Sequence, residues 1–167
     1  YTVTGGLGGL GMRAAVLLVK GGATRVLLAS RSGRVVRNGQ GLEAQLQAMG
    51  TVTAVLACDS ADASDVTALL SASALKGVLH AAGAGEKGLL IELETHRVQW
   101  MYASKAMGAW YMQCAAPTTP LEARMLFSSV GSGLGNVGQA NYAAGNACLD
   151  SHALSRRTRA IVACSLQ

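Results

Sequence analysis

Short, largely apolar runs alternate along this chain with longer segments whose apolar residues recur at helical spacing. The runs predict strands at 2–4, 26–29, 52–57, 78–82, 125–127 and 161–164. The other segments predict helices at 12–19, 42–49, 65–70, 95–115 and 141–156. Strands that are apolar throughout are typical of a parallel sheet with helices on both faces. The pattern therefore predicts an α/β domain on a Rossmann-type, doubly wound parallel sheet with strand order 3-2-1-4-5-6.

The composition is that of one packed domain. Hydrophobic residues make up 50% of the 167 residues and charged residues 14%, which excludes a disordered chain. No apolar run approaches the roughly 18 residues of a membrane span, and no signal peptide is visible. Because the sequence starts without Met and inside a strand, we expect residues 1–167 to be a single domain truncated at both ends, a fragment of a multidomain chain. We expect an intracellular, cytoplasmic location, although a fragment would not show organelle targeting.

Cysteine spacing and charge exclude two further kinds of site. The cysteines are scattered, without metal-ligand spacing, and are expected to be buried free thiols: Cys58, Cys114, Cys148 and Cys164. The net charge of +5 includes arginine clusters at 25–37 and 156–159. Without aromatic platforms or a reading motif, these clusters indicate solvated faces and no nucleic-acid partner.

A glycine-rich turn separates the first predicted strand from the first helix. It consists of Thr4, Gly5, Gly6, Leu7, Gly8, Gly9, Leu10 and Gly11. Such a turn lets the backbone approach a pyrophosphate and directs the N–H groups of the helix N-terminus at the phosphates. The turn therefore predicts dinucleotide binding; a merely flexible turn is the alternative.

The ends of the next two strands bear on which cofactor binds. Ser30, Arg31 and Ser32 follow the second strand, where an acidic residue favours NAD and a basic residue accommodates the 2′-phosphate of NADP. Arg31 therefore favours NADPH, unless it is an ordinary surface arginine. Asp59, at the end of the third strand, is placed either to bond the adenine or to cap the following helix, for which Asp62 and Ser64 are the other candidates.

Four polar residues are predicted to meet at the carboxyl edge of the sheet. Ser129 ends the fifth strand, Tyr142 begins the next helix, and Asn146 lies one turn later on the same face. Lys105 lies in an apolar helix, where it either reaches solvent or is held inward. Because α/β folds bind ligands at this edge, we expect Lys105 to point inward. Purely structural roles are the alternative for each of the four residues. Among the histidines, His80 is expected to serve structure at a strand end, and His96 and His152 to be exposed.

Longer segments around these residues resemble the ketoreductase domains of polyketide synthases, within the short-chain dehydrogenase/reductase superfamily. The matching segments are 4–11, 30–33, 58–59, 80–83, 127–130 and 138–150. Ordinary members of the superfamily carry lysine four residues after the tyrosine, where this chain has Asn146. In polyketide and animal fatty acid synthase reductases, which share this scheme, an earlier helix supplies the lysine at the position of Lys105. The resemblance covers essentially the whole chain.

The resemblance implies NADPH-dependent reduction of a β-ketoacyl thioester, carried by an acyl carrier protein among neighbouring synthase domains, to the β-hydroxyacyl thioester. Tyr142 would donate the proton, and Lys105 would stabilise the phenolate and hold the nicotinamide ribose. Ser129 would hydrogen-bond the carbonyl oxygen, and Asn146 would organise the lysine and a proton-supplying water. Cofactor contacts are also expected from Tyr142 and from Ala81, Ala82 and Gly83.

This chain departs from the family pattern in several places. Gly85-Glu86-Lys87 replaces one stereochemical marker and Leu134 the other, so the product configuration is open, as are chain length and oligomeric state. Family members continue past the position of Gln167 into a nicotinamide-contacting loop, a lid helix and a seventh strand, and a structural subdomain usually precedes the catalytic half. We therefore expect this segment alone to be weakly active or inactive. The alternatives are a free-standing reductase of a small ketone and an NADPH-binding or scaffolding domain without catalysis.

Overall fold

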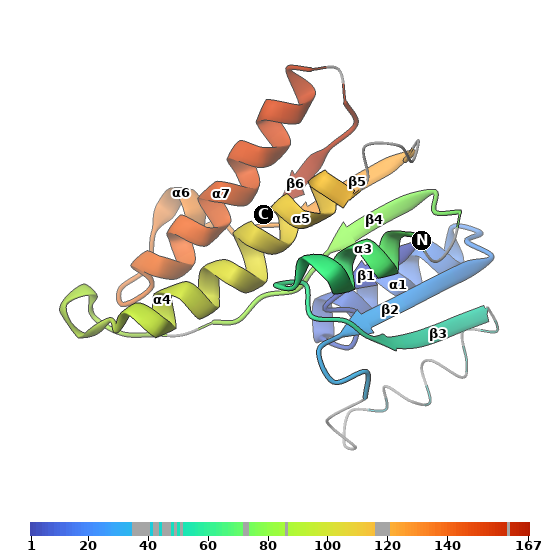
Figure 1. Cartoon of the computed structure of the whole chain (residues 1–167), viewed down its shortest axis with the longest axis horizontal. Coiled ribbons are helices and arrows are strands. Elements are labelled where there is room, and N and C mark those ends of the chain that lie inside the picture. Colours follow the sequence, from blue (N-terminus) through green and yellow to red (C-terminus); the bar gives the residue numbers. More distant parts are fainter. Residues whose placement is uncertain are drawn as a thin grey trace.

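The strands of this chain form one parallel sheet (Figure 1). The computed structural model describes residues 1–34, 41, 44, 48, 50, 52–71, 74–85, 87–115, 121–159 and 161–167. The strands are β1 (Thr2–Thr4), β2 (Arg25–Ser30), β3 (Val52–Ala57), β4 (Gly77–His80), β5 (Ala123–Phe127) and β6 (Cys164–Leu166). Their order is β3-β2-β1-β4-β5-β6, and every neighbouring pair is parallel. The prediction of a Rossmann-type sheet is confirmed.

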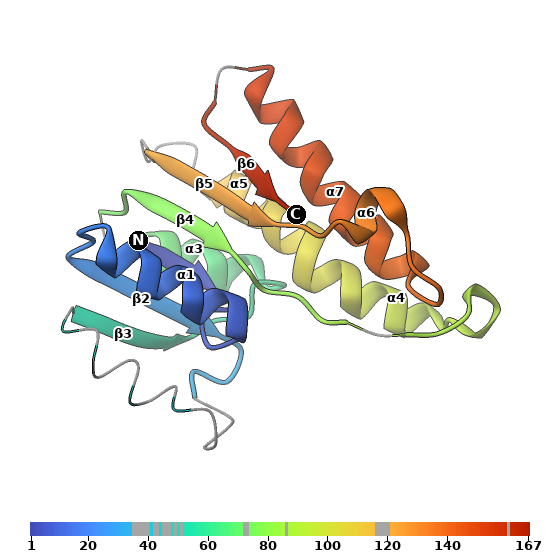
Figure 2. The ribbon, with the colours of Figure 1, turned by 180° about the vertical axis from the view of Figure 1, so that it is seen from behind.

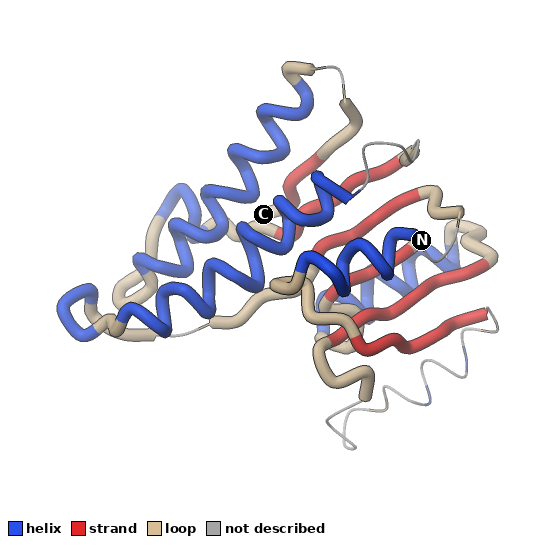
Figure 3. Tube along the Cα trace, viewed as in Figure 1, coloured by secondary structure: helices blue, strands red, loops and turns tan. Residues whose placement is uncertain are grey.

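Helices cover both faces of the sheet (Figures 1 and 2). They are α1 (Gly9–Lys20), α3 (Ala63–Ser71), α4 (Thr95–Tyr102), α5 (Gly108–Ala115), α6 (Gly131–Leu134) and α7 (Ala140–Arg157). A 3-10 turn, η1 (Leu90–Glu92), precedes α4, and a π-helical turn, η2 (Ala103–Met107), joins α4 to α5. Figure 3 shows α4, η2 and α5 following one another without a loop, so the helical segment predicted at 95–115 is present, with a π-helical turn inside it. The apolar positions that predict a helix at 42–49 lie outside the described residues: Leu42, Leu46 and Met49.

The core forms on the two faces of the central strands. On β4, Leu79 packs with α1, whereas Val78 packs with α3 and α5, because successive strand side chains point to opposite faces. Asp62 caps α3, since its Oδ1 accepts the N–H groups of Ser64 at 2.8 Å and Asp65 at 3.0 Å. Burial of apolar side chains thus holds the sheet between its helices, and the Asp62 cap fixes where α3 begins.

Several strand bounds differ from the predictions, by at most two residues except at the start of the last strand. The last strand runs over Cys164–Leu166, so its predicted start at 161 is wrong. The N–H of Ile161 donates to the carbonyl of Arg156 at the end of α7, so this backbone belongs to the helix terminus and is not paired in the sheet. The fourth strand ends at His80, two residues earlier than predicted, and Ala81 and Ala82 leave the sheet to line a cavity.

Exposure corrects the predictions for some surface residues. Cys58 is buried, but Cys114 and Cys164 are exposed, because one lies in the last turn of α5 and the other on the outermost strand of the sheet. His152 is half-buried against Trp110, with 5.8 Å between the ring centroids, whereas His96 is exposed as expected. Within the described ranges, no helix is both long and apolar enough to cross a bilayer.

Candidate active site

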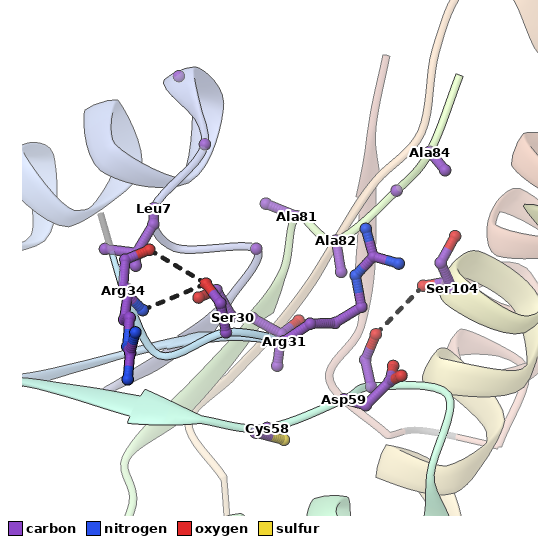
Figure 4. Close-up of a pocket in the computed structure, with 17 residues that line it drawn as sticks. Leu7, Ser30, Arg31, Arg34, Cys58, Asp59, Ala81, Ala82, Ala84 and Ser104 are labelled. Carbon is purple, nitrogen blue, oxygen red and sulfur yellow. Dashed lines mark hydrogen bonds between the residues drawn. The ribbon is translucent and has the colours of Figure 1, made fainter. Parts of the chain in front are cut away.

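A cavity of about 800 Å³ opens at the carboxyl ends of β1, β2, β3 and β4 (Figure 4). Most of the predicted cofactor contacts line it: Thr4, Gly5, Leu7, Gly8, Gly9, Ser30, Arg31, Ser32, Asp59, Ala81, Ala82 and Gly83. Its other lining residues are Arg34, Cys58, Ser60, Ala84 and Ser104. Segments far apart in the sequence therefore meet here, as expected for the ligand-binding edge of a doubly wound sheet.

The glycine-rich turn is shaped by close backbone contacts. Gly5 has a φ of +67°, and a Cβ there would lie 2.6 Å from the carbonyl carbon of Ala81. A Cβ on Gly11 would overlap the carbonyl oxygen of Gly5, whereas a Cβ on Gly9 would meet no atom within 4 Å. The first two glycines thus allow the turn to pack, and Gly9 leaves open a cradle at the N-terminus of α1. An anionic phosphate group fits such a cradle, where helix N–H groups lack partners within the helix.

The remaining predicted residues of the turn do not line the cavity. A Cβ on Gly6 would lie 2.7 Å from the carbonyl oxygen of Val3, so Gly6 serves the packing of the turn. Leu10 is 62% exposed and lines a second groove, along α1. The pattern of glycines identified the turn correctly but did not separate residues that face a ligand from residues that shape the backbone.

Two arginines line the cavity beside the end of β2. Arg31 extends across the cavity toward the helix that carries Ser104 (Figure 4), and its Cζ lies 5.8 Å from the centroid of the Trp100 ring. Arg34 was not predicted; its N–H donates to Ser32 Oγ at 3.3 Å, which fixes the turn after β2. Only its position three residues after Arg31 could have signalled it. Both guanidinium groups suit a phosphate on the adenosine side of a dinucleotide.

Asp59 closes the bottom of the same cavity. Its Oδ1 accepts the N–H of Ala61 at 2.9 Å, and its own N–H donates to Asp65 Oδ2 at 2.9 Å. Asp59 therefore forms a local turn before α3, and the predicted alternative of capping that helix falls to Asp62. Asp59 lines the cavity beside Ser60, and a carboxylate there can accept a hydrogen bond from an adenine amino group.

Lys105 points inward from the π-helical turn, as expected. The residue is only 5% exposed, and its Nζ donates to Asn146 Oδ1 at 2.9 Å. The same Nζ lies 3.5 Å from the carbonyl oxygen of Phe127 and 5.2 Å from the centroid of the Tyr142 ring. Burial lowers the pKa of this ammonium group, because desolvation disfavours its charged form.

Asn146 links Lys105 to the helix that carries Tyr142. It is fully buried, and its Nδ2 donates to the carbonyl oxygen of Tyr142, four residues earlier, at 2.8 Å. With Nδ2 engaged in this way, the amide oxygen is directed at Lys105. The spacing of four residues on α7 explains why both side chains reach the same point.

Ser129 and Tyr142 flank Gly131 at the start of α6. Ser129 Oγ accepts the N–H of Gly131 at 3.1 Å, so its hydroxyl hydrogen is available to a ligand oxygen. A Cβ on Gly131 would lie 3.4 Å from Ser129 Oγ and 3.9 Å from the ring of Tyr142. The four predicted catalytic residues therefore lie in one cluster, with the two hydroxyl-bearing side chains on one side and the Lys105–Asn146 pair on the other.

Support for this cluster comes from a residue that the sequence did not indicate. Asp150 Oδ2 accepts the hydroxyl of Ser132 at 2.7 Å, while the N–H of Ser132 donates to the carbonyl of Ser129 at 2.9 Å. Partial burial raises the pKa of Asp150, but hydrogen bonds from four side chains outweigh it and hold this pKa below its usual value: those of Ser132, Ser128, Ser165 and Gln167. Leu134, at the end of α6, is 86% exposed, and Glu86 lies outside the described residues.

The fold and this cluster define a class of protein. A parallel sheet of this order, with a glycine-rich turn after its first strand and Ser129, Tyr142 and Lys105 grouped at its carboxyl edge, is a Rossmann-type domain of the short-chain dehydrogenase/reductase class. A family model described as "KR domain" matches residues 1–167, and the chain belongs to that family. Domains of this family bind a nicotinamide cofactor, and the cradle at Gly9 and the arginines beside β2 fit one.

Relatives with curated names are polyketide synthases. The chain is 42% identical over 168 residues to polyketide synthase GfsB of Streptomyces halstedii, with 98% of this chain and 3% of that protein covered. It is 38% identical to 6-methylsalicylic acid synthase of Aspergillus terreus, with 94% and 10% covered. The chain thus spans a small part of the relatives that it matches.

Solved structures of ketoreductases share the fold. The structure described as A-type ketoreductases from modular polyketide synthase has a TM-score of 0.90 and 34% identity, with 98% of this chain and 36% of that chain covered. The ketoreductase from the first module of phoslactomycin biosynthesis in Streptomyces sp. HK803 has a TM-score of 0.90 and 35% identity, with 98% and 39% covered. The resemblance to polyketide synthase ketoreductase domains is confirmed.

Proposed function

We propose that this chain catalyses the NADPH-dependent reduction of a β-ketoacyl thioester, tethered to an acyl carrier protein, to the β-hydroxyacyl thioester. The observation that carries the proposal is the Lys105–Asn146 hydrogen bond of 2.9 Å, with Lys105 Nζ 5.2 Å from the centre of the Tyr142 ring. A buried cation at this place has a chemical consequence, because it stabilises negative charge on the phenol oxygen.

Binding would use the residues of the cavity. The N-terminus of α1, with its cradle at Gly9, would hold the pyrophosphate, and Arg31 and Arg34 would bind the 2′-phosphate. Ala81, Ala82 and Gly83 form the wall between this end and Lys105, along which the rest of the cofactor would extend. When bound, NADPH supplies the hydride that adds to the ketone carbon.

Proton transfer would be the task of the protein. Tyr142 would give its proton to the ketone oxygen, and the ammonium of Lys105, whose Nζ lies 5.2 Å from the centroid of the Tyr142 ring, would stabilise the phenolate that forms. Ser129 would donate a hydrogen bond to that oxygen as negative charge develops on it. Lys105 would then pass a proton to the phenolate and regain one from a water, and Asn146 would organise both the lysine and that water. One hydride and one proton convert the ketone to the alcohol.

The polyketide context supports a thioester substrate over a small free ketone. Both relatives reported above are synthases, and this chain covers only 3% of GfsB and 10% of 6-methylsalicylic acid synthase. Neighbouring synthase domains and a carrier-borne acyl chain are therefore the partners that we propose.

The test is NADPH oxidation by the full natural polypeptide with a β-ketoacyl N-acetylcysteamine thioester, beside its Tyr142→Phe variant. We expect turnover to fall by about 100-fold or more in the variant, the size of a lost general acid, with NADPH binding retained. Equal turnover in both proteins would contradict the role of Tyr142. NADPH binding without turnover in the unmodified protein would favour the non-catalytic alternative.

A further inference from the structure

One buried histidine ring joins the two halves of the candidate site. His80 ends β4 and is 0% exposed. Its Nδ1 lies 2.7 Å from Thr4 Oγ1, and its Nε2 lies 3.1 Å from the carbonyl oxygen of Lys105. Thr4 is the first residue of the glycine-rich turn, and Lys105 is the middle residue of the π-helical turn η2. The ring therefore contacts the cofactor side and the proton-transfer side of the site at once.

The two contacts assign the hydrogen on the ring. A carbonyl oxygen only accepts, so Nε2 carries the hydrogen and donates it to Lys105. Nδ1 is then the acceptor, and the hydroxyl of Thr4 donates to it. Burial, with a smaller effect of the Lys105 charge, lowers the pKa of His80 to about 4, so the ring is neutral at physiological pH. Both nitrogens are thus satisfied in one tautomer.

The backbone of η2 is arranged to receive this ring. A π-helical turn interrupts the regular ladder of α-helical hydrogen bonds and commonly occurs at functional sites. Gly108 follows η2, and a Cβ there would lie 3.0 Å from Cε1 of His80. Because Gly108 has no Cβ, the ring packs directly on the helix backbone.

The side chain of Lys105 has little room to compensate for a backbone shift. A Cβ on Gly83 would lie 2.9 Å from Lys105 Cε, and a Cβ on Gly145 would lie 3.6 Å from Lys105 Cδ. The lysine side chain therefore passes between two glycine backbones. A displacement of the backbone at residue 105 would be transmitted to Nζ, which lies 2.9 Å from Asn146 Oδ1.

We propose that His80 is a positioning residue: by donating from Nε2 to the Lys105 carbonyl, it holds η2 where Lys105 Nζ reaches Asn146 and Tyr142. Its bond from Thr4 ties this turn to the strand that leads into the glycine-rich turn. The inference rests on the function proposed for Lys105 above.

Two substitutions at position 80 separate the two bonds of the ring. The amide nitrogen of His80→Gln lies near the position of Nε2 and can still donate to the Lys105 carbonyl. The amide of His80→Asn is shorter, reaches only the position of Nδ1, and can keep the Thr4 contact alone. In the full natural polypeptide, we expect kcat to fall about 10- to 100-fold in His80→Asn and less than about 5-fold in His80→Gln, since small misplacements cost this much. The KM for NADPH should change less than about 3-fold in both.

The pH profile reports on the lysine itself. Burial lowers the pKa of Lys105, so a lysine released toward water has a higher pKa. We expect the alkaline limb of the kcat profile to move to higher pH in His80→Asn and to stay in place in His80→Gln.

A labelling experiment needs no turnover. Reductive methylation, followed by mass spectrometry of the peptides, should label Lys105 at least about 5-fold faster in His80→Asn than in the unmodified protein, with exposed Lys20 as internal reference. Val78→Ala is the matched control, because Val78 is 5% exposed on the same strand and packs with α3 and α5. Val78→Ala should lower the stability of the domain. It should leave the rate of Lys105 labelling, kcat and the alkaline limb of the kcat pH profile unchanged.

The outcomes distinguish the two proposals. Unchanged Lys105 labelling and kcat in folded His80→Asn would overturn the positioning role, as would equal losses in Val78→Ala. Full turnover in Lys105→Met would instead refute the role proposed for Lys105, and a lack of turnover in the unmodified protein would refute the proposed function, whatever the His80 variants show. Faster labelling in His80→Asn, with recovery in His80→Gln, would establish the positioning role.

Discussion

The charged side chain of Lys105 is buried. The glycines at 83 and 145 leave space for its methylene groups, and Asn146 Oδ1 replaces water as acceptor at 2.9 Å. Burying a cation costs free energy unless polar groups compensate for the lost hydration. An amide oxygen and the Phe127 carbonyl provide that compensation without a carboxylate, so the positive charge stays available to Tyr142.

We predict that Arg31 sets the preference for NADPH over NADH. Arg31→Ala removes a charged donor to the 2′-phosphate, a hydrogen bond worth about 1.5–3 kcal/mol, so we expect the Kd for NADPH to rise about 10- to 100-fold. The Kd for NADH, which lacks that phosphate, should change little. Fluorescence titration measures both constants. Arg13→Ala, an exposed arginine on α1 outside the cavity, is the control and should change neither. Equal weakening of both cofactors by Arg31→Ala would argue against 2′-phosphate recognition.

Sequence reasoning identified the four residues that we propose to be catalytic, but not the residues that support them. Tyr142 and Asn146 could be identified from the sequence because they are four residues apart on one predicted helix. Lys105 could be identified because it matches the position of the lysine in the family that the chain resembles. Asp150 was not found, since its contact with Ser132 spans 18 residues and depends on the direction of α6. The Thr4–His80 contact spans 76 residues and exists only because β1 pairs with β4.

Among the elements, the glycine-rich turn contains some glycines that allow its backbone to pack and others that leave space for a ligand. Gly11→Ala would overlap the Gly5 carbonyl, so we expect it to destabilise the domain by about 1–3 kcal/mol, the cost of overpacking. Gly9→Ala meets no atom within 4 Å but extends into the cavity wall, so it should keep stability and weaken NADPH binding instead. Urea unfolding and NADPH titration of the two variants measure this contrast. The same loss of stability in both variants would contradict the assignment.

The elements also show where periodicity stops being informative. The long helix at 95–115 was predicted as one regular segment, but a π-helical turn at Ala103–Met107 interrupts it, and apolar spacing does not reveal such a turn. The short helix Gly131–Leu134 contains two glycines and no apolar repeat, and the sequence did not predict it. The last strand was placed too early because Ile161 and Val162 are apolar yet 40% and 57% exposed.

In the molecule as a whole, the parallel sheet brings the residues of the candidate site to one edge, the carboxyl ends of its strands. Because all six strands are parallel, their carboxyl ends bring the glycine-rich turn, Arg31, Lys105 and Ser129 to the same side. The apolar strands and the glycine turn predicted this architecture, since few other arrangements bury such strands on both faces. The surfaces that contact neighbouring domains or partners could not be predicted, because the periodicity of apolar residues describes only the buried faces of helices and strands.

The stability of the whole domain should depend on pH through His80. Its folded pKa of about 4 lies below the usual 6.5, so the unfolded chain binds more protons between these values and stability falls as pH drops. We expect a loss of about 2–3 kcal/mol from pH 7.5 to pH 4.5, with a smaller contribution of the same sign from His152. Hydrogen exchange in the peptide that contains β4, measured at increasing urea concentrations at each pH, gives the midpoint of urea unfolding at that pH.

Substitutions assign this pH dependence to one residue. His80→Gln should remove most of it, and His96→Gln, at an exposed position, should retain it. Asp62 and Asp150, whose pKa values are lowered, lose their contributions only at still lower pH, as the carboxylates become protonated. A full pH dependence in His80→Gln would show that the buried ring is not its source.

The most direct measurement follows the hydride. The full natural polypeptide is incubated with a β-ketoacyl thioester and NADPH that carries deuterium at both C4 positions, and the product is analysed by mass spectrometry. The account predicts a β-hydroxyacyl thioester with one deuterium at the carbinol carbon, formed by the unmodified protein and not by Tyr142→Phe. Unlabelled alcohol, or labelled alcohol formed equally well by Tyr142→Phe, would contradict it.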